Sequence, residues 1–172
     1  RFAVADGARV ISDRILGRHS VDLATTGGDF TILRRDGTPA YQLAVVVDDH
    51  DDGVTEVVRG ADLLESAARQ AQLYAAFGWT PPSWAHVPLV TDALGLRLAK
   101  RTDALSLAHL RELGVHPEAI VGWAARSLGL GELEGARASE LVDCFSMERI
   151  LQRSSALDPL TLSRLTGTFR TR

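Results

Sequence analysis

Short runs of β-branched residues alternate with polar residues over the first 38 positions, and turn-forming pairs separate these runs. Residues 29–34 have this alternation and are followed directly by Asp36 and Gly37, which is typical of a strand that enters a tight turn. Residues 9–13 form a weaker strand candidate. The pattern therefore predicts that region 1–38 is mostly β.

The pattern changes to α/β over residues 39–104. Residues 54–59 alternate as a strand does, residues 62–77 carry a broad apolar face at helical spacing, and residues 85–90 form a short buried run. A strand, a helix and a strand in this order predict a right-handed crossover in a parallel sheet. The apolar run 41–47 is too short for its periodicity to decide between strand and helix.

From residue 105 onward the pattern predicts only helices. Leucines at helical spacing mark one helix that ends at Gly114, and Pro117 is placed to open the next one. Further short helices are predicted at 138–145 and 158–165. The expected inner face of the helix after Pro117 consists of Ile120, Val121, Ala124 and Leu128.

Composition narrows the class of protein. A length of 172 residues suits one ordinary domain, since domains commonly run ~100–200 residues. With 45% hydrophobic and 24% charged residues, the chain is neither a disordered tail, nor a collagen-like fibre, nor a disulfide-rich miniprotein. The net charge of −3 excludes a basic coat protein for nucleic acid, although a local basic face stays possible.

Three further features concern the setting of the protein. The single cysteine, Cys144, allows no internal disulfide and no cysteine-based zinc site, which fits a cytoplasmic location. No apolar run approaches the ~18–20 residues that cross a bilayer, so no membrane partner is expected. The chain begins with Arg1 and not with methionine, which predicts that an upstream part has been removed or that a longer protein exists.

Most isolated candidates for chemistry have a simpler explanation. The acidic run 48–52 lacks the spacing of a calcium loop and is best interpreted as a solvated loop. His86, His109 and His116 have no partner at ligand spacing, so each is expected to be an ordinary polar or hydrogen-bonded histidine. The sequence contains no G-x-S-x-G elbow, no Walker-type loop and no G-x-G-x-x-G fingerprint.

One basic segment, residues 97–101, follows a turn and precedes a predicted helix. A loop there places two or three cations where they can contact polyphosphate, but basic surface segments are common and the segment alone is weak evidence.

The order of several segments is more specific than any one of them. They are 28–30, 34–37, 41–49, 54–64, 86–90 and 97–101. Their series closely resembles the second half of the catalytic domain of glutamyl-tRNA synthetases. It is most similar to their shortened paralogues, the glutamyl-Q tRNA(Asp) synthetases, in which the sequence Ala-Tyr-Gln-Leu-Ala-Val-Val-Val-Asp-Asp is typical. The resemblance covers about residues 1–130, whereas the tail beyond them matches neither subfamily well.

The resemblance implies an α/β fold, namely the second half of a class I synthetase Rossmann-type parallel sheet. A small β-rich connecting region (1–38) would precede it, and a helical region (105–172) would follow it. It also implies that 41–49 is a helix. Tyr41 and Arg59 correspond to residues that bind the substrate glutamate. An arginine at the carboxyl end of a parallel strand suits this role, because its planar guanidinium grips a carboxylate at two points.

For ATP, the resemblance points to residues on both sides of the nucleotide. Asp62 corresponds to an acidic residue beside the nucleotide, and the backbone of Leu89 and Val90 to the strand that recognises adenine. The basic segment matches the KMSKS-type loop, with Lys100 as the catalytic lysine that stabilises charge on the phosphates and Arg97 in place of the first lysine. Ala99 replaces a serine there, so slower activation is expected. Mg²⁺ would enter with ATP, and no zinc is implied for this portion.

The family's upstream arginine-serine pair and HIGH-like motif do not occur in the sequence. The resemblance therefore implies a class I synthetase-like ligase whose N-terminal half is absent here and whose isolated chain is inactive. Its substrates would be glutamate, ATP and a tRNA, with the queuosine of tRNA(Asp) as acceptor. The alternatives are a fragment of a true glutamyl-tRNA synthetase that charges tRNA(Glu), or a half-site that binds ligands without catalysis.

Overall fold

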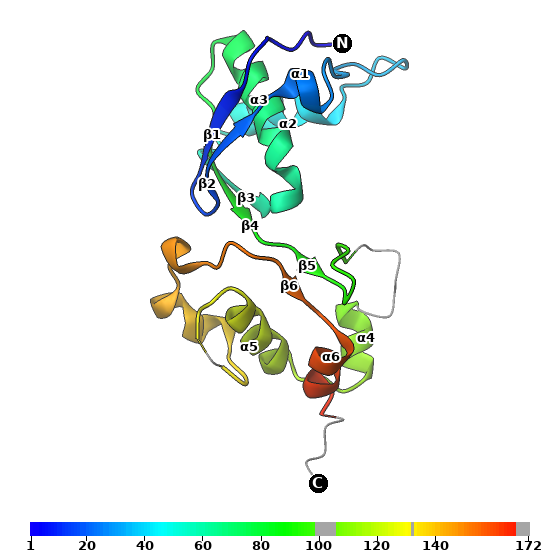
Figure 1. Cartoon of the computed structure of the whole chain (residues 1–172), viewed down its shortest axis with the longest axis vertical. Helices are drawn as coiled ribbons and strands as arrows, with labels where there is room; N and C mark the ends of the chain where they lie inside the picture. Colours follow the sequence, from blue (N-terminus) through cyan, green and yellow to red (C-terminus); the bar gives the residue numbers. More distant parts are fainter. Residues whose placement is uncertain (99–105, 132, 168–172) are drawn as a thin grey trace. The chain divides into compact units, whose positions relative to one another are not determined.

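The computed structural model describes residues 1–98, 106–131 and 133–167 (Figure 1). The chain divides into two compact units, Arg1–Val87 and Pro88–Arg172. This single boundary lies within the α/β part that composition delimits at 39–104. The division into three regions by composition thus stays a prediction.

A four-stranded mixed sheet forms the first unit, in the order β2-β1-β4-β3. Strands β1 (Arg9–Asp13) and β2 (Gly17–Val21) make an antiparallel hairpin, which confirms the weak strand expected at 9–13. Strand β4 (Ser83–Val87) pairs in parallel with β3 (Glu56–Gly60) on one side and with β1 on the other. The parallel pair between β3 and β4 is the one that the sequence pattern predicts.

Helix α3 (Leu64–Phe77) connects β3 to β4 after a short 3₁₀ turn, η1 (Ala61–Leu63). It ends at Gly78, whose φ of 72° is the left-handed conformation that glycine adopts without a Cβ clash. Helix α2 (Tyr41–Asp51) packs against α3, and the short α1 (Leu23–Thr26) lies at the end of the hairpin. Residues 41–47 are therefore helical, as the resemblance implies.

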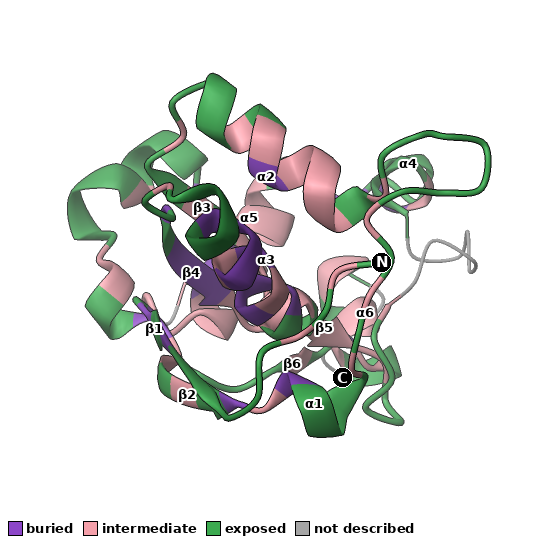
Figure 2. Cartoon of the chain, turned by 90° about the horizontal axis from the view of Figure 1, so that it is seen from above, coloured by how far each residue is buried: buried purple, intermediate pink, exposed green. Residues whose placement is uncertain are grey.

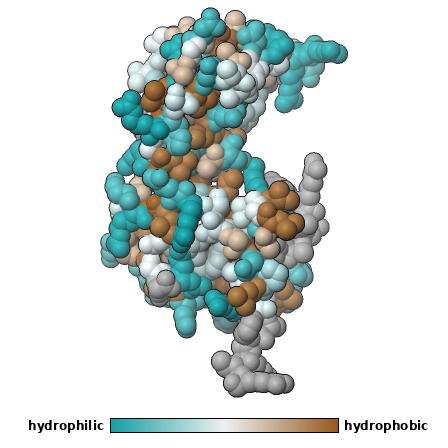
Figure 3. Space-filling view, viewed as in Figure 1, coloured by the Kyte–Doolittle hydropathy of each residue, from teal (hydrophilic) through white to brown (hydrophobic). Residues whose placement is uncertain are grey.

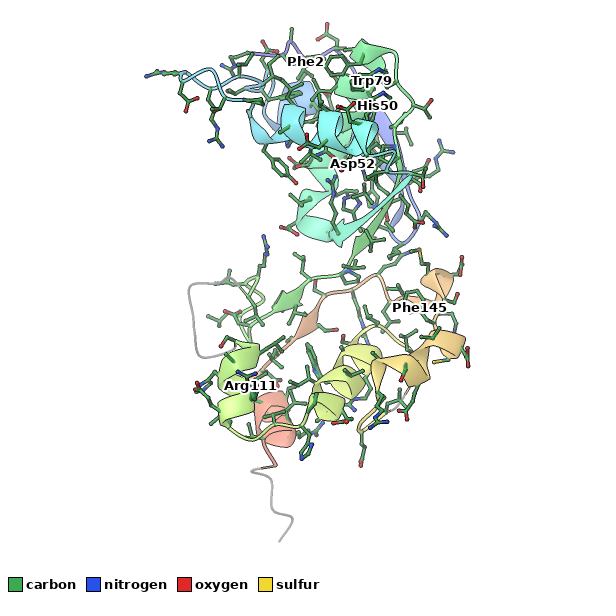
Figure 4. The ribbon with its side chains drawn as sticks, turned by 180° about the vertical axis from the view of Figure 1, so that it is seen from behind. Phe2, His50, Asp52, Trp79, Arg111 and Phe145 are labelled. Carbon is green, nitrogen blue, oxygen red and sulfur yellow. The ribbon has the colours of Figure 1, made fainter. Side chains whose placement is uncertain are left out.

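Apolar residues of α3 and the sheet build the core of this unit, which Figure 2 shows as the purple segments of α3 and β4. The buried members are Ile11, Val21, Leu23, Ala67, Ala68 and Trp84. A second cluster joins Val46 of α2 to Leu73 and Tyr74 of α3. Beside it the rings of His50 and Trp79 stack 3.8 Å apart, and Figure 4 shows them together at the end of α2.

Two expectations for the first unit are wrong. Residues 29–34 form no strand and make only isolated bridges, Phe2 with Phe30 and Leu33 with Pro39. The turn at Asp36 and Gly37 does exist, but the chain on either side of it pairs only through the bridge between Leu33 and Pro39 and forms no ladder. The acidic run 48–52 lies mostly in helix α2 and not in a loop, because residues 41–47 begin that helix.

The second unit mixes helices with two short parallel strands, β5 (Val90–Thr91) and β6 (Ser155–Ala156). The α-helices are α4 (Leu107–Glu112), α5 (Pro117–Ser127) and α6 (Pro159–Leu165). The 3₁₀ helices η3 (Ala138–Cys144) and η4 (Met147–Arg149) lie between α5 and β6. The expectation that the tail is entirely helical is wrong, since β6 pairs with β5 from the start of the unit.

Helix α5 begins at Pro117 as expected, but it buries a different face. Gly122 and Ala125 are its buried residues, whereas the predicted inner face is only partly covered. The reason is a close backbone approach: a Cβ added at Gly122 would lie 2.9 Å from the Cα of Gly135. Small residues therefore mark the packed face of α5 better than large ones do.

On the face that Figure 3 shows, hydrophobic residues lie in several patches among hydrophilic and neutral ones. Within the described residues, no helix is long and apolar enough to cross a membrane.

Candidate functional site

Arg59 of β3 and His86 of β4 are register partners in the parallel ladder, and their side chains meet. The Nε atom of Arg59 donates to the Nε2 atom of His86 at 3.1 Å. Its Nη2 atom donates to the backbone carbonyl of Leu63 at 3.2 Å, in the 3₁₀ turn that follows the strand. The guanidinium is thus held along one edge by the sheet and the turn.

Behind this histidine lies a buried carboxylate. The side chains of His86 and Asp13 are both fully buried, and His86 Nδ1 lies 2.6 Å from Asp13 Oδ2. Asp13 also accepts hydrogen bonds from the backbone N–H groups of Ile15, Leu16 and His86, at 2.8–3.2 Å. Burial alone would raise the pKa of Asp13, but these bonds outweigh it and hold the pKa below its ordinary value.

Polar groups of α2 and η1 surround Arg59. Burial lowers the pKa of Arg59, while Tyr41, Asp49 and Asp62 act in the opposite direction, and Tyr41 also forms a side-chain hydrogen bond to it. Burial raises the pKa of Asp49, and the charge of Arg59 opposes that rise. Tyr41 is half exposed, at 49%, so this group of side chains is open to solvent on one side.

This arrangement suits recognition of a small zwitterion. A guanidinium held by fixed acceptors presents its remaining N–H groups to a carboxylate, and partial burial strengthens the contact. The neighbouring carboxylates can attract an ammonium group, while the Tyr41 hydroxyl can orient either end.

The structure brings three of the predicted residues together in the first unit, namely Tyr41, Arg59 and Asp62. Asp62 lies in the 3₁₀ turn η1 directly after β3. Sequence reasoning missed Asp13, Asp49 and His86 as members of this group. For His86 a signal existed: a polar residue in the middle of an apolar strand needs a buried partner. Nothing in the sequence pointed to Asp13.

The other predicted ATP residues lie in the second unit. The carbonyl of Leu89 accepts from the N–H of Ser155 at 3.0 Å, and the carbonyl of Val90 accepts from Leu98 at 3.1 Å. Arg97 follows a tight turn closed by Asp92 and forms a bridge with Thr91. Lys100, the predicted catalytic residue, lies outside the described residues.

A hollow of about 1040 Å³ opens in the second unit between α5, β6 and α6. Three arginines, Arg126, Arg153 and Arg164, line it together with Trp123, and Glu134 is the one described acidic residue in its wall. No carboxylate of the described ranges forms an ion pair with Arg126 or Arg153. The hollow is therefore a basic surface beside an aromatic ring.

Among the described residues, no group of three histidine, cysteine or acidic side chains is arranged to hold a metal ion. The single cysteine, Cys144, is exposed.

The parallel pair of β3 and β4, the helical crossover between them and Arg59 near the end of β3 agree with the fold that the resemblance implies. The model of the family "tRNA synthetases class I (E and Q), catalytic domain" matches residues 1–162, and the chain belongs to this family.

Two relatives illustrate the similarity. A glutamyl-Q tRNA(Asp) synthetase of Rhodopirellula baltica is 48% identical over 160 residues, which cover 85% of this chain and 49% of the relative. A glutamate–tRNA ligase of Rhodospirillum rubrum is 42% identical over 174 residues, covering 97% of this chain and 36% of the relative. The chain therefore spans about half or less of the length of these relatives.

Solved structures agree on the fold. The glutamate–tRNA synthetase of Elizabethkingia anophelis superimposes with a TM-score of 0.76 at 27% identity, over 94% of this chain and 36% of that one. A glutamate–tRNA ligase of Elizabethkingia meningosepticum, crystallised with its amino acid, has the same TM-score at 26% identity. The predicted α/β fold and the predicted family are both confirmed.

Proposed function

We propose that this chain is the part of an ATP-dependent, glutamate-activating ligase that binds the amino acid through Arg59 and Tyr41. The observation that carries the proposal is the fixed guanidinium at the end of β3, with a hydroxyl and two carboxylates around it. The names of the relatives support glutamate as the amino acid.

The chemistry of activation assigns separate tasks to separate residues. Arg59 would hold a carboxylate of glutamate through two N–H groups, and Tyr41 would orient the amino acid beside it. The substrate's α-carboxylate attacks the α-phosphorus of Mg²⁺-bound ATP, so that a mixed anhydride forms and pyrophosphate leaves. Holding the amino acid in one orientation makes this attack effectively intramolecular.

For the nucleotide we propose Asp62, Leu89, Val90, Arg97 and Lys100, on the strength of the family resemblance. A cation beside the departing pyrophosphate lowers the barrier by stabilising its developing charge. Lys100 is assigned this catalytic role, and its replacement by alanine in the enzyme at its natural length should lower kcat roughly 100-fold. Nearly unchanged KM values for glutamate and ATP should accompany that loss, because the contact forms in the transition state.

A tRNA is the proposed acceptor, and the basic hollow of the second unit supports a polyanionic partner. Arginines without ion-pair partners can neutralise phosphates, and an aromatic ring can stack on an exposed base. We propose the queuosine base of tRNA(Asp) as the acceptor, because the glutamyl-Q relative from Rhodopirellula baltica is 48% identical. The second candidate is the terminal adenosine of tRNA(Glu), which the names of the glutamate–tRNA ligases support.

The test uses the protein at its natural length. Glutamate-dependent exchange of pyrophosphate into ATP is expected, followed by transfer of labelled glutamate to queuosine-containing tRNA(Asp). Transfer to tRNA(Glu) instead would select the second candidate, and an absence of exchange with glutamate would contradict the function itself. The isolated 172 residues should show no exchange, and robust exchange by this piece alone would contradict the division of the site that we propose.

A further inference from the structure

The contacts of Arg59 form a continuous line into the core of the first unit. The guanidinium donates to His86 at 3.1 Å, and the ring of His86 contacts Asp13 at 2.6 Å. Both inner side chains are fully buried and belong to the two central strands, β4 and β1. Asp13 and His86 are 73 residues apart in the chain, so this contact exists only in the folded unit.

The hydrogen-bond partners of the His86 ring determine which of its nitrogen atoms carries the proton. A guanidinium has only N–H donors, so His86 Nε2 must accept the bond from Arg59 and carries no proton. The proton of the neutral ring then lies on Nδ1, which donates to the carboxylate of Asp13. Asp13 is in turn ionised and oriented by three backbone N–H groups, from Ile15, Leu16 and His86.

We propose that His86, oriented by Asp13, is a positioning residue that fixes the plane of the Arg59 guanidinium for the carboxylate of the substrate. This inference rests on the proposed function, since it concerns the glutamate site. The bond at Nε and the bond from Nη2 to Leu63 hold two corners of the planar group. The remaining donors therefore face a constant direction before the ligand arrives, which reduces the entropy lost on binding.

A purely structural role for the buried pair makes a different prediction. Asp13 and His86 also link β1 to β4, where the two strands share the register pair Asp13 and Trp84. If this link alone mattered, any substitution of His86 would act on stability and would change both substrate affinities alike. If His86 positions Arg59, the effect depends on whether an acceptor remains opposite the guanidinium.

Two substitutions separate these roles in the enzyme at its natural length. In His86→Asn the amide occupies the place of Nδ1, so it can contact Asp13 but cannot reach Arg59. In His86→Gln the longer side chain places an acceptor near the position of Nε2. We expect His86→Asn to raise the glutamate KM about 10-fold or more, as for the loss of a hydrogen bond to a charged group, with the ATP KM within about twofold. His86→Gln should restore most of the glutamate affinity.

Ala85→Gly is the matched control, because it weakens the same buried strand and leaves the side chains of Asp13, His86 and Arg59 in place. It should lower thermal stability and leave the glutamate KM unchanged. A wild-type glutamate KM in His86→Asn, or equal changes of both KM values in the Asn and Gln variants, would overturn the positioning role. Absence of glutamate-dependent exchange in the wild-type enzyme would overturn the proposed function instead.

A measurement without any variant covers the case in which His86→Asn fails to fold. Nitrogen-15 NMR of the imidazole distinguishes the two neutral tautomers and the imidazolium. The geometry requires the neutral tautomer with its proton on Nδ1 in the folded wild-type enzyme. A proton on Nε2 would remove the acceptor for Arg59 and would overturn the inference.

Discussion

The two units of this chain treat their polar groups in opposite ways. Every buried polar or charged residue among those described lies in the first unit, where Asp13 and His86 satisfy one another and hold Arg59. In the second unit, three arginines line an open hollow. A group that must keep one geometry benefits from burial and fixed hydrogen bonds, whereas the proposed contact with a large polyanion requires only charge and access.

The first prediction concerns the buried side of this comparison and has the largest expected effect. Arg59→Ala in the enzyme at its natural length should raise the glutamate KM roughly 30–150-fold, which corresponds to about 2–3 kcal/mol for a charge-assisted contact. The ATP KM should change far less. Steady-state pyrophosphate exchange at varied glutamate and ATP measures both values. Equal changes in the two would show that Arg59 serves folding and not recognition.

The second prediction concerns the packing of the helical unit. Gly122→Ala should destabilise that unit by about 1–3 kcal/mol, because the new Cβ would meet the backbone of Gly135 at 2.9 Å. Trp123 is the one tryptophan of this unit, so its fluorescence during guanidinium unfolding reports the unit's stability. Trp79 and Trp84 are replaced by phenylalanine in both variants so that they add no signal. Gly135→Ala is the control, since its Cβ would have ordinary contacts of 3.6 Å or more. Equal stability of the two variants would refute the close approach.

The third prediction uses the pH dependence of stability. The pKa of Asp13 is lower in the folded state than in the unfolded chain, so its contribution is complete above the unfolded value, near 4. That contribution should be lost as pH falls through the folded-state pKa, because the unfolded state takes up the proton first. Asp13→Asn should cost about 1–2 kcal/mol at neutral pH and flatten the acid limb of the stability curve. Urea unfolding between about pH 2 and about pH 7 measures this change in stability, because that range covers the titration of carboxyl groups.

Asp36→Asn provides the comparison for that experiment. Asp36 also has a lowered pKa, caused mainly by hydrogen bonds from Thr38, but it lies at an exposed turn. Its replacement should leave the acid limb close to that of the wild type. An identical flattening in both variants would mean that general carboxylate charge, and not the buried pair, sets the acid sensitivity.

The fourth prediction concerns the open side and has the smallest expected effect. Arg153→Glu should weaken tRNA binding a few-fold and reduce the slope of log affinity against log salt by roughly 1. Its stability should change by less than about 0.5 kcal/mol, as is usual for exposed positions. Arg137→Glu, which lies outside the hollow, is the control. Filter binding at several salt concentrations measures this slope for both variants. Equal slopes would show that the hollow is not part of the tRNA interface.

Local sequence patterns predict much of the fold, and the elements that they predict wrongly have a physical explanation. The β3–α3–β4 crossover follows from local periodicity and from Gly78, which stops the helix. Strand β6 and the absence of a strand at 29–34 depend on partners that are distant along the chain, which no local pattern reveals. For helix α5 the apolar pattern predicts the wrong face, because the packed face is made of the small residues Gly122 and Ala125.

The candidate site divides in the same way. Tyr41, Arg59 and Asp62 were predicted through the order of the motifs, and the structure brings these three together. Asp13 was not predicted, because its role arises only when β1 pairs with β4. The roles assigned to Leu89, Val90 and Arg97 stay predictions, and Lys100 lies outside the described residues.

The register of Arg59 and His86 ties recognition to the folding of the first unit. Their bond joins residues 27 apart in the chain, and the bond behind it joins residues 73 apart. Contacts of such long range are lost when the first unit opens, because no local segment holds both partners together. The amide of His86, bonded to Asp13, should therefore exchange its hydrogen only through near-global opening of the unit. A ligand held by Arg59 would slow that exchange by mass action, so amide exchange can report occupancy of the site without any catalytic turnover.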